Sequence, residues 1–260
     1  MPPRTIWRDI ADDLRRRVDA GEWGVGERLP TVRELMAQYG TPSQGAVVRA
    51  ISTLTNEGVL VTNPDAPRRG VRVRARTKLF RRGTSRYTRT PEGLSPNMDE
   101  AAAGGWQDEV TAERWREEAS EEIAARLGIA PGDPVTVARY LWLVDGQPVQ
   151  VGTQYEPLAL VQHTAIEEPV DGTRGNPGVI ARFDSIGVHV DRVEEETSAR
   201  MPSPEEREIL QLGAGVPILH ITRTHWAGDL AVETADIAIC GDRMVITTTH
   251  HVPLPEGDSQ

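Results

Sequence analysis

Apolar residues repeat with a helical period as far as Gly58 and with a strand-like pattern over most of the chain beyond it. Three amphipathic stripes precede Gly58, the first built on Ile10 and Leu14. Two short apolar runs, 59–61 and 71–73, then predict a pair of strands joined by a turn-rich segment. These patterns divide the chain into two units, and a length of 260 residues is typical of two domains.

The second unit mixes helices with strands. Asp145-Gly146 lies between two apolar runs and predicts a hairpin turn. Runs of this kind without an internal repeat favour an α+β fold with an antiparallel sheet. Helices are expected over residues 117–127, 178–186 and 203–212, and strands over 135–144, 149–155, 188–198, 218–226, 230–239 and 244–252.

The charges are unevenly distributed between the two units. Residues 1–90 contain 18 Lys and Arg against 9 Asp and Glu, a net of +9. Residues 91–260 contain 11 against 30, a net of -19. A basic segment on an acidic chain indicates nucleic-acid contact, and a solvated basic face is the alternative.

Several classes of protein and of site are excluded. A single cysteine, Cys240, rules out a disulfide framework and a multi-thiolate zinc site. No run of about 18 apolar residues and no secretory signal occurs, which predicts a cytoplasmic protein that does not span a membrane. The histidines lack metal-ligand spacing, and there is no nucleophile elbow and no P-loop. We therefore expect no enzymatic activity, no cofactor and no metal.

Two blocks of residues carry a family resemblance. Gly26-Glu27-Arg28-Leu29-Pro30-Thr31-Val32-Arg33-Glu34-Leu35 resembles the winged helix-turn-helix of the GntR family of bacterial repressors. The second unit looks like the UTRA effector-binding domain of the HutC subfamily. Its signature here is Arg139, Asp145-Gly146-Gln147-Pro148-Val149, Tyr155-Glu156-Pro157, Arg200-Met201-Pro202-Ser203-Pro204-Glu205-Glu206, Arg223, Glu233 and Asp242-Arg243.

The resemblance implies a domain plan and a function. Residues 1–76 would form the winged helix-turn-helix, 77–104 a linker, and 105–255 a UTRA domain with a chorismate-lyase-like antiparallel sheet and helices. The chain would be a homodimeric transcriptional repressor on a pseudo-palindromic double-stranded DNA operator, released by a small-molecule effector. A DNA-binding regulator without effector control is one alternative. A lyase-like enzyme is a remote second, which would not require the basic first domain.

The candidate DNA contacts lie on the second and third helices and on the wing. Each has an ordinary structural alternative: Ser43 could be only a helix cap, Gln44 only an exposed side chain, Arg33 only a helix-face charge near Glu34, and the wing tip a solvated turn. Where the family usually has Arg, Thr and Arg, this chain has Gln44, Ala46 and Val48. The candidates are Thr31, Arg33, Ser43, Gln44, Gly45, Arg49, Arg68, Arg69 and Gly70.

The candidate effector contacts are Arg139, Tyr155, Arg182, Arg223 and Glu233. Arg139 on a strand suits bidentate capture of a carboxylate or phosphate, which favours an anionic effector. The alternative is an ion pair with an internal partner such as Glu233, which could also bind Arg223.

Overall fold

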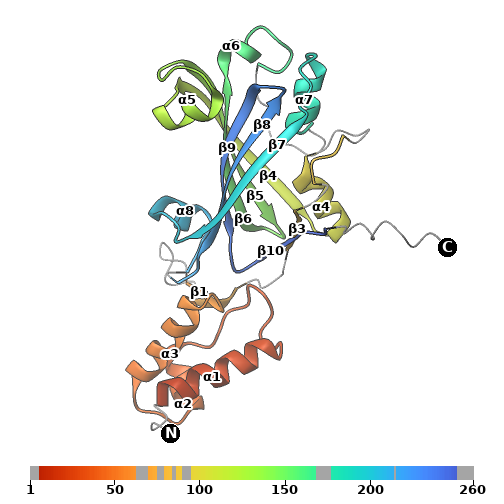
Figure 1. The fold of residues 1–260 in the computed structure, drawn as a ribbon. Coiled ribbons are helices and arrows are strands. Elements are labelled where there is room, and N and C mark those ends of the chain that lie inside the picture. Colours follow the sequence, from red (N-terminus) through yellow and green to blue (C-terminus); the bar gives the residue numbers. More distant parts are fainter. Residues whose placement is uncertain are drawn as a thin grey trace, which may run out of the picture.

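The first domain is a three-helix unit closed by a small antiparallel ribbon (Figure 1). The computed structural model describes residues 6–62, 70–74, 79–83, 86–89, 95–167, 177–213 and 215–250. Leu14, Leu35, Val47 and Leu54 are fully buried where the three helices meet. The elements are α1 (Ile6–Asp19), α2 (Val32–Gln38), α3 (Gln44–Asn56), β1 (Leu60–Thr62) and β2 (Val71–Val73).

Both helices of the helix-turn-helix begin at a side-chain cap. The Thr31 hydroxyl accepts the amide of Glu34, and the Glu34 carboxylate accepts the amide of Thr31, so α2 opens with a complete capping box. The Ser43 hydroxyl accepts the amide of Ala46 at the start of α3. These caps satisfy backbone donors that a helix leaves unpaired, and they fix where each helix starts.

The second domain is built on a six-stranded antiparallel sheet with strand order β4-β5-β6-β9-β8-β7. The hairpin between the second and third of these strands turns at Asp145 and Gly146, both at positive φ, as the sequence predicts. The strands are β4 (Asp108–Glu118), β5 (Pro134–Val144), β6 (Gln147–Pro157), β7 (Arg192–Arg200), β8 (Ile218–Ala227) and β9 (Leu230–Cys240).

Helices cover both faces of this sheet. Figure 1 places α5 and α8 on one side and α4 and α7 on the other, with α6 near the upper edge. None of the helices in the described residues is long and apolar enough to span a membrane. The helices are α4 (Pro96–Gly104), α5 (Glu121–Leu127), α6 (Leu158–Val161), α7 (Val179–Ser185) and α8 (Pro204–Ile209).

The segment expected to be a linker contributes structure to the second domain. Strand β3 (Leu79–Arg82) pairs in parallel with β10 (Met244–Thr247), outside the main sheet. Helix α4 packs beside β3. The described part of residues 77–104 therefore carries side chains into the second domain.

The structure differs from the sequence-based elements at one edge of the sheet. The predicted helix at 117–127 begins only at Glu121, capped by Ser120, because Glu117 and Glu118 belong to β4. Strand β4 was not predicted. Most of its side chains are exposed and many are charged, so it has no apolar run. Eleven paired positions along β5 hold it in place.

Candidate functional sites

Helix α3 presents a mostly uncharged face to solvent. Gln44, Gly45, Val48 and Ser52 are exposed on it, and Val48 keeps 42% of its surface accessible. The opposite face is the buried stripe of Val47, Ala50, Ile51 and Leu54. Within the helix, only Arg49 adds a charge, and its guanidinium lies over the Trp7 ring of α1, 4.5 Å from the ring centroid. The outward face of α3 can therefore meet a partner through small and neutral side chains.

The other predicted DNA contacts of the first domain have different surroundings. The hydroxyls of Thr31 and Ser43 serve as helix caps. Arg33 is exposed and forms no hydrogen bond or ion pair within the described part of the chain. Gly70 has a φ of +73°, a conformation that favours glycine. The wing-tip residues Arg68 and Arg69 lie outside the described residues.

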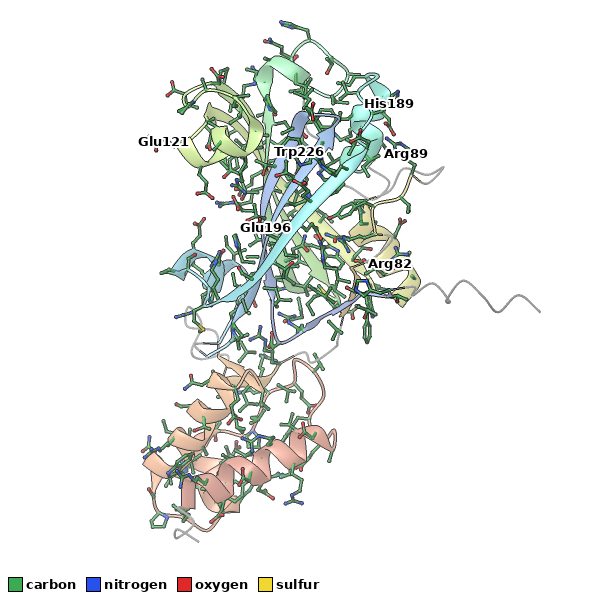
Figure 2. All side chains as sticks on the ribbon, viewed as in Figure 1. Arg82, Arg89, Glu121, His189, Glu196 and Trp226 are labelled. Carbon is green, nitrogen blue, oxygen red and sulfur yellow. The ribbon has the colours of Figure 1, made fainter. Side chains whose placement is uncertain are left out.

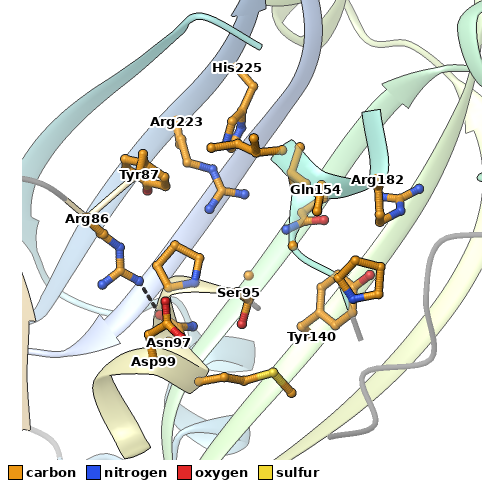
Figure 3. Close-up of a pocket in the computed structure, with 18 of the residues that line it drawn as sticks. Arg86, Tyr87, Ser95, Asn97, Asp99, Tyr140, Gln154, Arg182, Arg223 and His225 are labelled. Atoms are coloured by element: carbon orange, nitrogen blue, oxygen red, sulfur yellow. Dashed lines mark hydrogen bonds between the residues drawn. The ribbon is translucent and has the colours of Figure 1, made fainter. Parts of the chain in front are cut away.

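A cavity of about 340 Å³ lies between the sheet and the side that carries α4 and α7. Figure 3 shows its wall, with Tyr87 and Arg86 on one side and Tyr140 and Arg182 on the other. The Tyr140 pKa is raised to about 12 by burial, so this phenol stays protonated near neutral pH. Trp142 Nε1 and Gln150 Oε1 are buried in the wall and have no hydrogen-bond partner among the described residues. A bound molecule or water would satisfy such groups.

Arg182 reaches the cavity from α7 and is held by β6. It donates to both carboxylate oxygens of Glu156, at 2.6 and 3.1 Å, and to the carbonyl of Ile166 at 3.0 Å. Both charged side chains are almost fully buried. Burial alone would lower the pKa of Arg182, but the carboxylate of Glu156 outweighs burial, and the pKa is raised.

Arg223 and His225 share the carboxylate of Glu233. Arg223 donates to one oxygen at 2.7 Å, and His225 Nδ1 lies 2.5 Å from the other. Burial opposes the ionisation of Glu233, yet Arg223 and His225 hold its pKa at about 2. Arg223 and His225 line the cavity, and Glu233 lies behind them as their shared anchor. This cluster joins two adjacent strands, β8 and β9.

Arg139 and Tyr155 lie on the other face of the sheet. Arg139 donates to Glu205, at the start of α8, at 2.8 Å, and two-thirds of the Glu205 side chain is exposed. Tyr155 packs in the cluster around Ile123 of α5. Side chains alternate along a strand, so Tyr140 and Gln154, each one residue away, face the cavity instead. Neither Arg139 nor Tyr155, both predicted effector contacts, therefore lines this cavity, and the alternative pairing of Arg139 with Glu233 is not formed either.

Three further arginines come from the basic segment that follows the wing. Arg81 pairs with Glu195, Arg86 with Glu100, and Arg89 with Asp184 at 2.8 Å. Figure 2 shows Arg89 beside His189, which also contacts Asp184. All three arginines line the cavity. Sequence reasoning missed them because their carboxylate partners lie far away in the chain or in a segment without periodic pattern.

The two domains meet at the end of α3. Gly213 and Gly215 lie against the carbonyl oxygens of Thr55 and Asn56, and neither glycine has room for a Cβ atom. This close approach brings the loop between α8 and β8 onto the last turn of α3 (Figure 1). A larger residue at either glycine would push the domains apart.

A buried arginine joins the ribbon of the first domain to the turn after β9. Arg74 follows β2, is 2% exposed, and places Nε 3.3 Å from Asp242 Oδ2. Burial lowers its pKa, because Asp242 compensates only in part. The turn that carries Asp242 leads directly into β10, which pairs with β3. Strand β3 in turn places Arg81 in the cavity wall. The paired strands β10 and β3 therefore link the contact between Arg74 and Asp242 to the cavity.

Family comparisons agree with this arrangement. The model of the UTRA domain matches residues 110–244, and the model described as bacterial regulatory proteins, gntR family, matches residues 7–73. Together they include the helix-turn-helix and the six-stranded sheet.

Individual proteins extend the similarity over most of the chain. A helix-turn-helix transcriptional regulator of Streptomyces coelicolor is 31% identical over 86% of this chain and 84% of its own length. The histidine utilization repressor of Pseudomonas putida is 26% identical over 93% of this chain and 90% of its own. A crystal structure of a regulator assigned to the GntR family superposes with a TM-score of 0.60 at 31% identity, covering 96% of this chain and 98% of that one.

Proposed function

Because the chain belongs to the GntR family of bacterial regulatory proteins and carries a UTRA domain, we propose that it is a cytoplasmic, homodimeric repressor that an effector releases from its operator. Repression is proposed from the similarity to the histidine utilization repressor. Two copies related by a two-fold axis would place their α3 helices in successive major grooves of a pseudo-palindromic site. The observation that carries this proposal is the exposed face of α3 beside the unpaired Arg33.

The DNA contacts divide by the chemistry of the side chains. Arg33 would reach a guanine edge or a phosphate, and Gln44 would bond an adenine. Gly45 allows close approach of the helix backbone. Arg49 would leave the Trp7 ring to meet a phosphate. The remaining contacts would come from the helix starts and the wing: Thr31, Ser43, Arg68, Arg69 and Gly70.

The effector would occupy the cavity beside Arg182 and Arg223, with Glu233 orienting Arg223. Every arginine in the cavity wall already faces a carboxylate, at Glu195, Glu100, Asp184, Glu156 or Glu233. A multiply charged anion would find little uncompensated positive charge there. We therefore propose an effector with a single anionic group and a larger uncharged body that packs on Tyr140 and Trp142.

Coupling between the sites would pass through the domain contact. An effector that displaces Arg81 would act on β3, and one that displaces Arg223 would act on β9 through Glu233. Strand β9 runs into the turn that holds Arg74, and β3 pairs with β10, which leaves that turn. The loop at Gly213 and Gly215 would transmit the same shift to the end of α3. An effector can release DNA only as far as it binds one domain arrangement better than the other.

The test uses the full-length protein and a library of genomic duplex fragments. We expect retention of specific fragments, with affinity that falls steeply between low and physiological salt because bound phosphates release counterions. A melting-temperature screen of singly charged small molecules should then find one that weakens this binding. Binding that no compound changes would favour a regulator without effector control. A protein that retains no duplex at low salt would contradict the proposal.

A further inference from the structure

We propose that Val48 contacts the C5 methyl group of a thymine in the major groove, so that this chain selects half-sites with an A·T pair at that position. The inference rests on the proposed DNA-binding function and adds the identity of one base pair. It concerns a side chain that can neither donate nor accept a hydrogen bond. It therefore contributes to recognition through apolar contact with a base and not through hydrogen bonds.

The position of Val48 on α3 supports this role. Its 42% exposure is unusual in a helix whose other apolar side chains are buried at 7% or less. Gly45 lies one turn earlier on the same side, and a Cβ built there would meet nothing within 4 Å. Ser52 lies one turn later and is also exposed. With Gly45 before it and Ser52 after it, Val48 is the apolar group that projects from this surface, and Gln44 is its longer polar neighbour at the start of the helix.

The chemistry of the valine side chain limits which base it can recognise. A valine in a helix strongly prefers one χ1 rotamer, so its two methyl groups are fixed before any partner arrives. In the major groove, the thymine methyl is the one apolar group that a base pair presents. A cytosine at that position would present only a C5 hydrogen where thymine has its methyl group, so the apolar contact with the valine would be lost.

A singly exposed valine by itself would need no explanation. Val25 is such a residue, 60% exposed in the loop before α2. Val48 differs because it lies on the recognition helix, on the side opposite Val47, Ala50 and Leu54. That side is the surface that a helix-turn-helix places against base edges. Val25 therefore provides a matched control with the same chemistry elsewhere in the domain.

The experiment removes one methyl group at a time from the DNA. A duplex is selected from a random library with the full-length wild-type protein, and each thymine is replaced singly by deoxyuridine. We expect one thymine in each half-site whose replacement weakens binding about fourfold, the value of one buried methyl-sized group. The Val48→Ala variant should bind the thymine and uracil duplexes equally well. The Val25→Ala variant should keep the wild-type pattern.

The outcomes separate this inference from the proposed function. A wild-type protein indifferent to uracil at every position, or a selected half-site without thymine, would overturn the role of Val48. A Val48→Ala protein that still discriminates thymine from uracil would overturn it as well. Failure to enrich any duplex would instead count against DNA binding itself. Circular dichroism of each variant, expected to match the wild type, excludes loss of the helix as the cause.

Discussion

Arginines in the second domain differ in what their removal leaves behind. Arg182 and Glu156 are both about 4% exposed or less, and each is the other's main charged partner. Arg139 and Glu205 form a bond of similar length, but much of both side chains remains in water. Distance alone therefore does not rank these pairs, because solvent screens the second pair and not the first.

Arg182→Ala should lower the free energy of unfolding by about 3–5 kcal/mol, because it leaves the buried carboxylate of Glu156 without its cation. Arg139→Ala should change it by about 1 kcal/mol or less. Urea unfolding followed by circular dichroism measures both. The double variant Arg182→Met/Glu156→Leu removes both charges and should recover much of the loss. Equal destabilisation by Arg182→Ala and Arg139→Ala would contradict the claim that burial separates the two pairs.

His225 gives the second domain a dependence on pH. Burial lowers its pKa below the ordinary 6.5, despite the nearby carboxylates of Glu233 and Glu195 and with Arg223 acting in the same direction as burial. The unfolded chain therefore binds a proton at this position at higher pH than the folded chain does. Stability from the neutral histidine is complete above about pH 6.5 and is lost as pH falls below that value. The lowered pKa of Glu233 adds a loss in the same direction below about pH 4.5.

The melting temperature should accordingly fall as pH is lowered from 7.5 to 5.5, and His225→Gln should flatten that decline. His220→Gln is the matched control, since His220 lies on the same strand, 3.6 Å from Asp236, with a quarter of its side chain exposed. It should retain the wild-type slope. A His225→Gln protein that loses stability as steeply as the wild type would show that other groups cause the decline.

At the scale of the elements, the two helices of the helix-turn-helix differ in how their starts are stabilised, and α3 has only one local interaction there. The Ser43 hydroxyl accepts the Ala46 amide at 3.2 Å, and no acidic side chain in the first turn supports the helix dipole. Helix α2 has two devices, a threonine cap and Glu34. The start of α3 is therefore the less reinforced of the two.

Ser43→Ala should lower the stability of the first domain by about 1 kcal/mol, the usual cost of losing such a cap. Ser43→Asp should restore it, because a carboxylate accepts the same amide. Thermal unfolding of the full chain, with hydrogen exchange at the amides of residues 44–47, measures the effect. Ser52→Ala, a change on the exposed surface of the same helix, should leave stability within about 0.5 kcal/mol of the wild type. Unchanged exchange in Ser43→Ala would show that the cap is dispensable.

At the scale of the whole molecule, only part of the positive charge of residues 1–90 is exposed where DNA could bind it. The net of +9 over residues 1–90 includes Arg74, Arg81 and Arg86, which are 5% exposed or less and face carboxylates of the second domain or α4. These three arginines contribute to holding the domains and the cavity. The charge available to DNA lies in the exposed arginines of the first domain.

The close contact between the domains should be broken by one methyl group. Gly215→Ala would place a Cβ against the carbonyl oxygen of Asn56, and we expect the loop to withdraw from α3 at a cost of about 1–3 kcal/mol. Hydrogen exchange at residues 55–60 should become faster, and small-angle scattering should show a larger radius of gyration for the whole protein. Gly24→Ala, where the nearest atom is 3.6 Å away, should change neither. Unaltered exchange in Gly215→Ala would mean that the contact does not restrain α3.

Local patterns in the sequence determined most of the elements. The stripe of Ile10 and Leu14, the cap at Ser43 and the turn at Asp145-Gly146 each depend on residues a few positions apart, and the structure contains all three. The family blocks then identified the two domains. The sequence did not predict strand β4, because this edge strand has charged side chains and no apolar run. Only its pairing with β5 defines it.

Tertiary structure alone decided which charges meet and which face of the sheet holds the cavity. The sequence favoured Arg139 over Arg182 as an effector contact, but the pleat of β5 turns Arg139 away from the cavity while α7 carries Arg182 into its wall. In the sequence, Arg81 is one of several residues of a basic segment. Only the fold shows that it pairs with Glu195, 114 residues later. The physical reason is that burial and ion pairing are set by residues distant in the chain, whereas helix caps, turns and apolar periods are set by neighbours.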